Sequence, residues 1–228
     1  MTRGWFVTGT DTGVGKTRVA AGLVAAFRRQ GHRVAGMKPV ASGCVATPDG
    51  LRNEDALALI DASGLDLPYD WVNPYAFAPP IAPHIAAADV GQPIRFAPLK
   101  QALERLHSHA DCVVVEGVGG WRVPLGPDGD VADLAVALGL PVVLVVGLRL
   151  GCLNHAALTM ADVRRTGVGV AGWVASAVDP GFARVTDNLA TLGDIMATPC
   201  LGVVAHRPTA SAGQVAAGLR LPKMAPRP

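Results

Sequence analysis

Short apolar runs alternate along this chain with longer stretches in which apolar residues recur at helical spacing. The apolar runs contain few polar residues, which is typical of strands that are buried on both faces of a parallel sheet. This alternation favours an α/β fold built around such a sheet. The predicted strands are residues 5–8, 33–38, 112–116, 142–146, 168–175 and 201–204. The predicted helices are residues 16–30, 53–62, 98–107, 131–138, 153–166 and 182–196.

Glycines and prolines mark the boundaries of this pattern. Gly31, Gly139 and Gly167 each follow a predicted helix, where a left-handed turn favours glycine. Residues 68–98 contain seven prolines together with aromatic residues and alanines, so we expect an irregular but packed excursion over the sheet. Residues 208–228 are rich in Ala, Gly and Pro and are expected to be an irregular or partly disordered tail of one domain that spans residues 1–228.

Composition narrows the class of protein. Half of the 228 residues are hydrophobic and 17% are charged, which allows a large core without disulfides. The formal net charge of +2 gives no electrostatic signature of a nucleic-acid or membrane partner. The longest apolar run, residues 140–148, is too short to span a bilayer, and the N-terminus has no secretory pattern. The four cysteines lack Cys-x-x-Cys spacing, so we expect a soluble, cytoplasmic protein with reduced thiols.

A glycine-rich loop lies between the first predicted strand and the first predicted helix. Residues 9–17 read Gly-Thr-Asp-Thr-Gly-Val-Gly-Lys-Thr. Glycines in such a loop let backbone N–H groups converge on phosphate oxygens, and the following helix directs the positive end of its dipole there. Lys16 would then reach the outer phosphates and the Thr17 hydroxyl would bind Mg²⁺. The loop departs from the usual spacing because Thr10 stands where the first glycine would be.

This loop predicts a nucleotide site rather than a merely flexible turn. The fold class is therefore α/β, a single-domain doubly wound and mostly parallel sheet of the P-loop NTPase type. The other residues of the loop and helix start that we expect to bind the nucleotide are Gly13, Val14, Gly15 and Arg18.

Two carboxylates are candidate metal ligands. Glu116 ends a predicted strand and is followed by a glycine-rich turn. Ligands bind beyond the carboxyl ends of parallel strands, so Glu116 is expected to bind Mg²⁺ beside the phosphate loop. Asp55 begins a predicted helix and is the second candidate. The alternatives are that Glu116 only caps the following loop and that Asp55 only complements the helix dipole.

Lys38 ends the second predicted strand. We expect the first two strands of a doubly wound sheet to end close together, so that its ammonium points into the same crevice as the phosphate loop, where it would stabilise a transferring phosphoryl group. The alternative is a lysine that extends from the sheet edge to solvent. Ser42 adds a hydroxyl for a substrate. Residues 151–155 open a helix whose free N–H groups could receive a carboxylate, or could be an ordinary helix start.

Together these segments resemble the dethiobiotin synthetase family over most of the chain. The most specific agreement is Lys-Pro-Val-Ala-Ser-Gly at residues 38–43 together with Gly-Cys-Leu-Asn-His at residues 151–155, because many NTPases share the phosphate loop. The other agreeing segments are residues 6–12, 15–17, 51–53, 55–57, 72–75, 83–85, 115–117, 119–121, 150–152 and 154–156.

The resemblance implies an ATP-dependent ligase of biotin biosynthesis that closes the ureido ring of dethiobiotin. The substrate 7,8-diaminononanoate takes up CO₂ (or bicarbonate) as a carbamate, and ATP phosphorylates the carbamate. The second amine then displaces phosphate, which gives dethiobiotin and ADP. Phosphorylation turns a poor leaving oxygen into a good one, so the enzyme mainly positions groups and neutralises charge.

The resemblance also implies roles for individual residues. Lys16 and Lys38 would stabilise the γ-phosphoryl group and the carbamate, and Thr12 and Ser42 would contact the diamine–carbamate end. The implied magnesium ligands are Thr17, Asp55 and Glu116. The further nucleotide-binding residues are Gly117, Val118, Gly119 and Ser176. The helix start that would receive the distal carboxylate, from the other subunit of a homodimer, is Gly151, Cys152, Leu153 and Asn154.

Two departures fall at the base-binding end that the resemblance implies. Ser176 stands where the family usually has an asparagine that recognises adenine, and Ala177 follows it in place of aspartate. Ala205, followed by His206 and Arg207, stands where proline usually follows the last strand. We therefore expect weaker selectivity for adenine than in the relatives.

Two other functions share parts of this pattern. An amide-forming ligase of the cobyrinic-acid type has the same loop and sheet but usually carries a glutamine-hydrolysing domain, for which this chain is too short. A nucleotide-switched ATPase that positions DNA or proteins at a membrane would be expected to have a basic patch or an amphipathic targeting helix. It would also carry an additional lysine near the start of the loop, where Thr10 and Asp11 stand.

Overall fold

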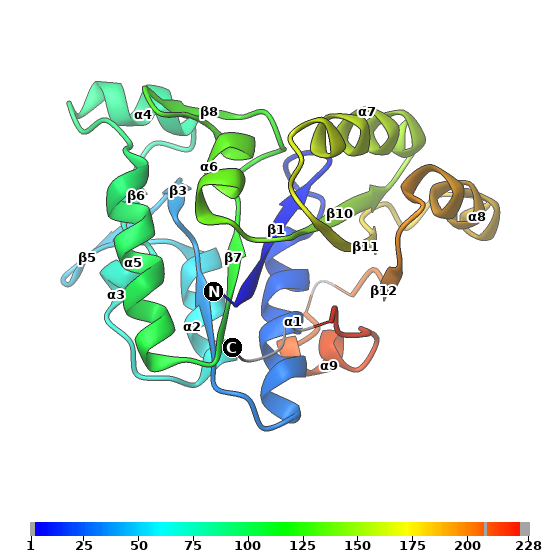
Figure 1. Ribbon diagram of the computed structural model, residues 1–228, viewed down its shortest axis with the longest axis horizontal. Helices are drawn as coiled ribbons and strands as arrows, with labels where there is room; N and C mark the ends of the chain where they lie inside the picture. Colours follow the sequence, from blue (N-terminus) through cyan, green and yellow to red (C-terminus); the bar gives the residue numbers. More distant parts are fainter. Residues whose placement is uncertain (1–2, 208, 224–228) are drawn as a thin grey trace.

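Six parallel strands form the central sheet of the computed structural model, which describes residues 3–207 and 209–223 (Figure 1). In the order of the sheet they are β12 (Cys200–Val204), β11 (Val170–Ala177), β10 (Val142–Leu148), β1 (Gly4–Gly9), β7 (Cys112–Glu116) and β2 (Val34–Met37). All neighbouring pairs are parallel. The order reverses next to β1, because β2 and β7 lie on one side of it and β10 to β12 on the other. The predicted doubly wound sheet is confirmed.

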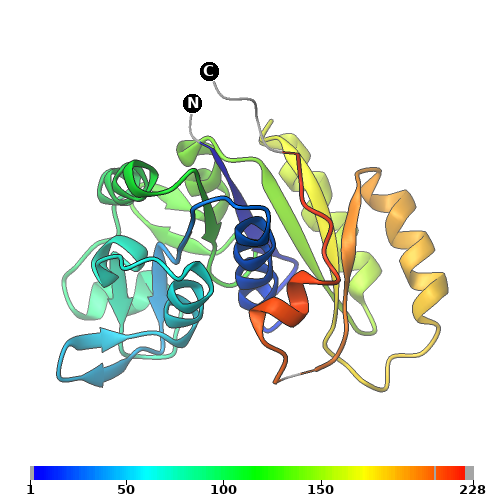
Figure 2. The same cartoon turned by 90° about the horizontal axis from the view of Figure 1, so that it is seen from below.

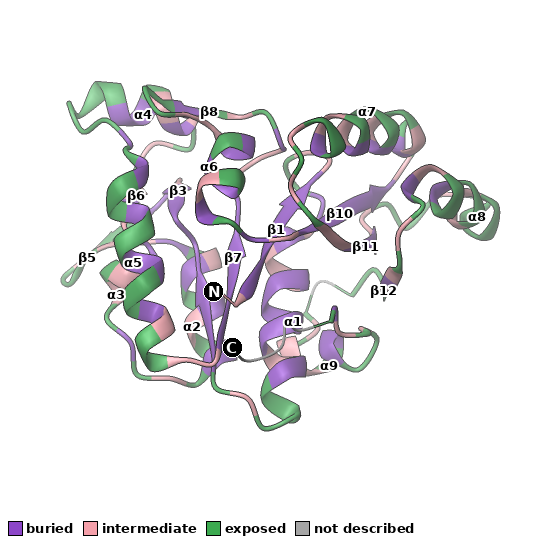
Figure 3. Cartoon of the chain, in the orientation of Figure 1, coloured by how far each residue is buried: buried purple, intermediate pink, exposed green. Residues whose placement is uncertain are grey.

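Helices cover both faces of this sheet. One face carries α1 (Lys16–Arg29), α2 (Glu54–Ser63) and the short α9 (Ala212–Ala216), and the other carries α5 (Phe96–His109), α6 (Val131–Leu138), α7 (Cys152–Arg165) and α8 (Val185–Met196) (Figures 1 and 2). Adjacent strand residues point to opposite faces. Trp5 therefore stacks on Phe27 of α1, whereas Phe6 packs in the cluster beneath α5 and α6. β1, β2, β7 and β10 are buried on both sides, whereas Val203 of the edge strand β12 is exposed (Figure 3).

The helix ends follow local signals in the sequence. The Asn53 side chain accepts hydrogen bonds from two N–H groups in the first turn of α2. Gly31, Gly139 and Gly167 have φ angles of 86°, 65° and 74°, so all three predicted left-handed glycines are confirmed. All the predicted strands and helices are present, with bounds that shift by a few residues at most. No helix in the described part of the chain is long and apolar enough to cross a bilayer.

Residues 68–98 are more regular than predicted. They contain α3 (Tyr69–Val72), β6 (Tyr75–Phe77), α4 (Pro83–Asp89) and the start of α5. β6 pairs in parallel with β3 (Val40–Ser42), directly after Lys38. Elements of three or four residues are too short to give a periodic pattern, so the sequence could not reveal them. Two short hairpins were missed for the same reason, β4 (Val45–Thr47) with β5 (Gly50–Arg52) and β8 (Pro124–Gly126) with β9 (Gly129–Asp130).

The expectation of an irregular tail is wrong for part of residues 208–228. α9 begins with a capping box in which the side chains of Ser211 and Gln214 each accept the other's backbone N–H. Val215 then packs on α1, where a Cβ at Gly22 would lie 2.6 Å from the Val215 side chain. The final Ala-Pro-Arg-Pro lies outside the described residues.

Gly36 of β2 lets α2 approach the sheet closely. A Cβ at this position would lie 2.6 Å from Leu59 Cβ and 3.3 Å from Leu59 Cα. We expect Gly36→Ala to lower the free energy of unfolding by about 1–3 kcal/mol, because α2 must move outward. The control is Gly193→Ala in α8, where a Cβ would meet nothing within 4 Å. This control should leave the free energy of unfolding unchanged or raise it by up to about 1 kcal/mol. Urea unfolding measures both variants, and equal effects of the two substitutions would contradict the close packing of α2 on β2.

Candidate active site

A cavity of about 750 Å³ opens at the carboxyl ends of the central strands, beside the start of α1. It is the position at which ligands bind in open α/β sheets, because the strand order reverses there. The cavity brings together most of the residues that the sequence singled out. The predicted site residues that line it are Thr12, Gly13, Gly15, Lys16, Thr17, Arg18, Lys38, Ser42, Asp55, Glu116, Val118 and Gly119.

The glycine-rich loop has the backbone that an anion site requires. Gly13 and Gly15 have φ angles of 73° and 88°, a left-handed conformation that side chains disfavour. Gly15 precedes the first residue of α1 and provides no side-chain cap, so the first N–H groups of the helix remain free to bind an anion. The Lys16 ammonium donates to the Asp11 carbonyl at 3.0 Å, which folds it back over the loop. Burial lowers the Lys16 pKa to about 8, although Glu116 opposes this shift.

Lys38 lies between two carboxylates. Its Nζ is 2.7 Å from Asp55 Oδ2 and 2.7 Å from Glu116 Oε1, and it also donates to the Gly117 carbonyl at 3.3 Å. Lys38 and Glu116 are almost completely buried, whereas Asp55 is partly exposed. The strand order explains the contact, because β7, which ends in Glu116, lies between β1 and β2. The first two strands are therefore not neighbours, yet Lys38 still points into the crevice beside the phosphate loop.

The charges in this cluster shift one another's pKa values. Burial disfavours the charged form of Lys38, but Glu116 and Asp55 outweigh it and raise the Lys38 pKa. Burial also opposes ionisation of Asp55, but Lys38 and Thr17 outweigh it and lower the Asp55 pKa. At Glu116 burial prevails over Lys38, and the pKa is raised. The ionised form of Glu116 therefore depends on positive charge close to it.

The oxygen atoms around Thr17 fit a divalent cation. The Thr17 hydroxyl lies 2.6 Å from Asp55 Oδ1 and 2.8 Å from Glu116 Oε1, although it has only one proton to donate. The other oxygen of Glu116, Oε2, is buried and has no partner among the described residues. Two carboxylates and a hydroxyl are ligands that Mg²⁺ prefers, with water and phosphate oxygens in the remaining positions. No group of three or more His, Cys, Asp or Glu in residues 3–207 and 209–223 forms a metal site.

Ser42 and Ser176 differ in their relation to the cavity. Ser42 Oγ is buried at the cavity wall and has no partner within the described residues. Ser176 is completely buried, and its Oγ lies 2.7 Å from the position of a Cβ on Gly15. It therefore packs behind the phosphate loop and offers no exposed surface to a base. The Val14 side chain is also buried and does not line the cavity, so only the backbone of Val14 is available to a nucleotide.

The start of α7 lies outside the cavity of its own chain. Gly151 has a φ of 93° and precedes the helix without a side-chain cap. The Cys152 N–H donates to the Arg149 carbonyl at 3.0 Å, so of the first helical N–H groups those of Leu153 and Asn154 have no partner among the described residues. Cys152 is buried, whereas Asn154 is exposed. None of the residues from Gly151 to Asn154 lines the cavity. A role in this site would require a second copy of the chain.

Sequence reasoning missed two parts of the site. Residues 80–83, from the loop after β6 to the start of α4, also line the cavity, and only the tertiary fold places them there. Arg149, at the end of β10, forms an ion pair with Asp11 of the phosphate loop. The arginine precedes the predicted helix start at residue 151 but carries no signal of its own in the sequence.

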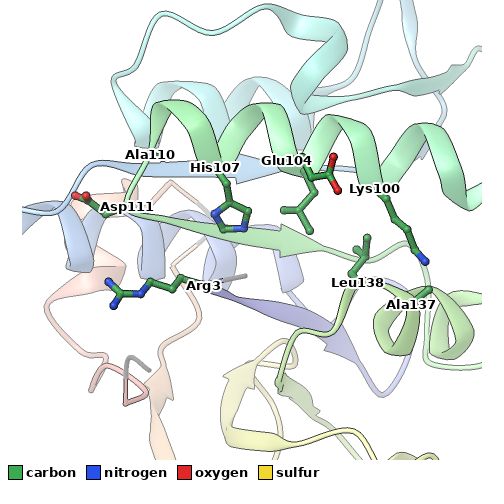
Figure 4. A pocket seen from close by; sticks show the side chains of 9 residues that line it. Arg3, Lys100, Glu104, His107, Ala110, Asp111, Ala137 and Leu138 are labelled. Carbon is green, nitrogen blue, oxygen red and sulfur yellow. The ribbon is translucent and has the colours of Figure 1, made fainter. Parts of the chain in front are cut away.

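A second cavity, of about 470 Å³, lies at the other end of the sheet (Figure 4). His107 and Lys100 of α5 line it together with Arg3, which precedes β1, and Leu138 of α6. It contains no glycine-rich loop and no free helix start. The candidate active site is therefore the cavity at the carboxyl ends of the strands.

Solved structures with a similar fold are P-loop NTPases. A chain of the MinC:MinD cell division protein complex of Aquifex aeolicus has a TM-score of 0.59 at 14% identity and covers 94% of this chain and 86% of its own. The signal recognition particle 54 kDa protein of Aeropyrum pernix has a TM-score of 0.58 at 17% identity, over 93% of this chain and 43% of that one. At these identities the likeness shows the fold alone.

Sequence relatives are far more similar. A family model described as "AAA domain" matches residues 3–214. A protein of Xanthomonas campestris pv. campestris named ATP-dependent dethiobiotin synthetase BioD is 53% identical over 219 residues, which cover 96% of this chain and 98% of the relative. A protein of Pseudomonas aeruginosa with the same name is 53% identical over 95% of this chain and 96% of its own length. With this agreement over nearly its full length, the chain belongs to the family of ATP-dependent dethiobiotin synthetases.

Proposed function

We propose that this chain is an ATP-dependent dethiobiotin synthetase, which closes the ureido ring of dethiobiotin from 7,8-diaminononanoate and CO₂ and releases ADP and phosphate. The observation that carries the proposal is the meeting of Lys16 and Thr17 of the phosphate loop with Lys38, Asp55 and Glu116 in one cavity. Family membership at 53% identity supports the same reaction.

The reaction has two bond-forming steps after the carbamate is made. One amine of the substrate adds to CO₂ and gives a carbamate. A carbamate oxygen then attacks the γ-phosphorus of ATP, which forms a carbamic–phosphoric anhydride and releases ADP. The second amine attacks the carbonyl carbon of this anhydride, the C–O bond to phosphate breaks, and the ureido ring closes. The protein's task is positioning and charge stabilisation.

The two lysines act on the transferring phosphoryl group. Lys16, held over the phosphate loop, neutralises the outer phosphate oxygens. Lys38, which lines the same cavity, stabilises the charge that develops between the γ-phosphate and the carbamate. Thr12 and Ser42 line the cavity and contact the diamine–carbamate end. The unpartnered Ser42 hydroxyl supports this role because a buried donor favours a ligand that satisfies it.

Thr17, Asp55 and Glu116 would hold Mg²⁺. The cation supplies charge stabilisation to phosphate oxygens when it is bound. The support comes from the single Thr17 proton between two carboxylates and from the unpartnered Glu116 oxygen. The protein is proposed to work in the cytoplasm, where its cysteines, all free, remain reduced.

We also propose a homodimer in which the start of α7 completes the site of the partner. The N–H groups of Leu153 and Asn154 suit the distal carboxylate of the substrate, yet these residues lie outside the cavity of their own chain. Leu150 and Leu158, on the loop before α7 and on α7 itself, are 93% and 65% exposed. Apolar side chains exposed beside this helix start support an interface there.

The direct test is product formation. We expect the purified chain to form dethiobiotin, detected by mass, when it is incubated with 7,8-diaminononanoate, bicarbonate, Mg²⁺ and ATP. Omission of the diamine should abolish ADP release as well as the product. ATP hydrolysis that ignores the diamine but responds to DNA, lipid or a protein partner would indicate a positioning ATPase instead.

Lys38→Met should abolish most turnover and keep nucleotide binding. Because the ammonium acts on the transferring phosphoryl group, we expect kcat to fall by about 10²–10³-fold, while the affinity for ADP changes only a few-fold. Lys100→Met is the matched control, because Lys100 lines the other cavity. Turnover follows from ADP release, and thermal unfolding shows whether the variant is folded. Turnover at the wild-type level in the folded variant would remove Lys38 from the chemistry.

The pKa of Lys16 predicts that ADP binding weakens at high pH. With a pKa of about 8 in the free protein, Lys16 is charged below this value, and bound phosphates raise its pKa. Above pH 8 the binding therefore takes up a proton, and the affinity falls by at most about tenfold per pH unit. Calorimetry in buffers of different ionisation enthalpy measures this uptake. The Lys16→Arg variant should bind ADP without proton uptake, because a guanidinium stays charged. Proton uptake that persists in this variant would mean that another group takes up the proton.

A further inference from the structure

The nucleoside end of the bound nucleotide must leave the phosphate loop on one particular side. Lys38, Asp55 and Glu116 occupy the side toward β7 and β2. With the outer phosphates and the cation directed to them, the nucleoside would extend the other way, toward the ends of β11 and β12. Arg18, the residue after Thr17 on α1, lines the cavity here.

The Arg18 guanidinium holds the segment that follows β12, residues 205–207. Its Nη2 donates to the Arg207 carbonyl at 2.8 Å and to the Ala205 carbonyl at 3.2 Å. His206 Nδ1 lies 3.2 Å from the Ala177 carbonyl at the end of β11. The Arg207 carbonyl also accepts from the Ala210 N–H at 3.0 Å. The segment is thus tied to α1, to β11 and to the chain that leads into α9, which lies beside α1 (Figures 1 and 2).

The hydrogen bonds from Arg18, His206 and Ala210 fix the position of residues 205–207. Ala205, His206 and Arg207 are all exposed and do not belong to any of the hydrophobic clusters of the described residues. An exposed segment without apolar anchors takes its position from its hydrogen bonds, and bonds from a charged donor are the strongest of these. Because Arg18 directly follows Thr17, the same helical turn fixes the phosphate loop and residues 205–207.

We propose that Arg18 is a positioning residue for the nucleoside of the bound nucleotide. Its guanidinium holds residues 205–207 beside the end of β11, at a set distance from the phosphate loop, so that base and ribose meet a preformed wall. The role rests on the proposed function, because it assumes a nucleotide substrate. Arg18 acts through the two carbonyls that it holds and not through contact with the phosphates.

Two ligands distinguish an effect of Arg18 on the nucleoside from an effect on the phosphates. ADP carries base, ribose and phosphates, whereas inorganic tripolyphosphate carries phosphates alone. We expect Arg18→Met to weaken ADP binding by about tenfold, the effect of losing roughly one charge-assisted hydrogen bond. Binding of tripolyphosphate should stay within about twofold of the wild type. Both affinities are measured by calorimetry on the full chain with Mg²⁺, and their ratio within one variant is insensitive to a general loss of stability.

Two control variants sharpen the result. Arg18→Lys keeps the positive charge, but its ammonium ends one atom short of the Nη2 that serves both carbonyls, so we expect ADP binding to stay weak. Arg28→Met removes an arginine from the other end of the same helix, where it donates to the Ala62 carbonyl at 2.7 Å. This variant should bind both ligands as the wild type does.

Three results would overturn the assignment. Equal weakening of ADP and tripolyphosphate in Arg18→Met, or full ADP affinity in Arg18→Lys, would mean that Arg18 acts as a charge on the phosphates. Unchanged ADP affinity in Arg18→Met would mean that the segment is held without it. The measurement uses no diamine, so it stands apart from dethiobiotin synthesis. Failure of the wild type to bind either ligand would overturn the proposed function, and this role with it.

Discussion

The Lys38 ammonium lies between two carboxylates, one buried and one partly exposed, and the rest of the site depends on this contact. Glu116 is almost fully buried, and leaving it and Asp55 together without a cation would cost several kcal/mol. The three side chains come from the end of β2, the start of α2 and the end of β7. Their contacts therefore fix the positions of β2, α2 and β7 relative to one another. The close approach of α2 to β2 at Gly36 is part of the same arrangement.

The fold alone would not have identified this chemistry. Chains of the MinC:MinD complex and of the signal recognition particle share the architecture at 14% and 17% identity. A phosphate loop and a parallel sheet are common to many functions, so function has to be argued from the side chains around the loop. In this chain Lys38 and Asp55 are the informative ones, because they come from outside the loop and Asp55 accepts from both the Thr17 hydroxyl and the Lys38 ammonium.

The sequence could predict what local patterns encode. Buried strands, amphipathic helices, the glycine-rich loop and the carboxylate of Glu116 at a strand end all follow from neighbouring residues. The insertion of β7 between β1 and β2 could not be predicted, because strand order depends on contacts between distant residues. For the same reason Ser176, expected to face a base, lies buried behind Gly15. The reach of Arg18 to residues 205–207 likewise depends on the tertiary fold.

The charge balance of the cavity explains why one lysine can serve both folding and chemistry. The charges of Lys16 and Lys38 are balanced by those of Asp55 and Glu116, so this cluster of four carries no net charge when ionised, and Arg18 at the edge gives the cavity lining a net charge of +1. A neutral cluster attracts a polyanion weakly at long range, and affinity must come from the N–H groups of the loop and from a cation that enters with the nucleotide. Once such a cation neutralises the two carboxylates, the Lys38 ammonium no longer has to compensate them. Its charge is then available to the phosphoryl group, so the side chain that stabilises the free protein becomes the one that stabilises the reaction.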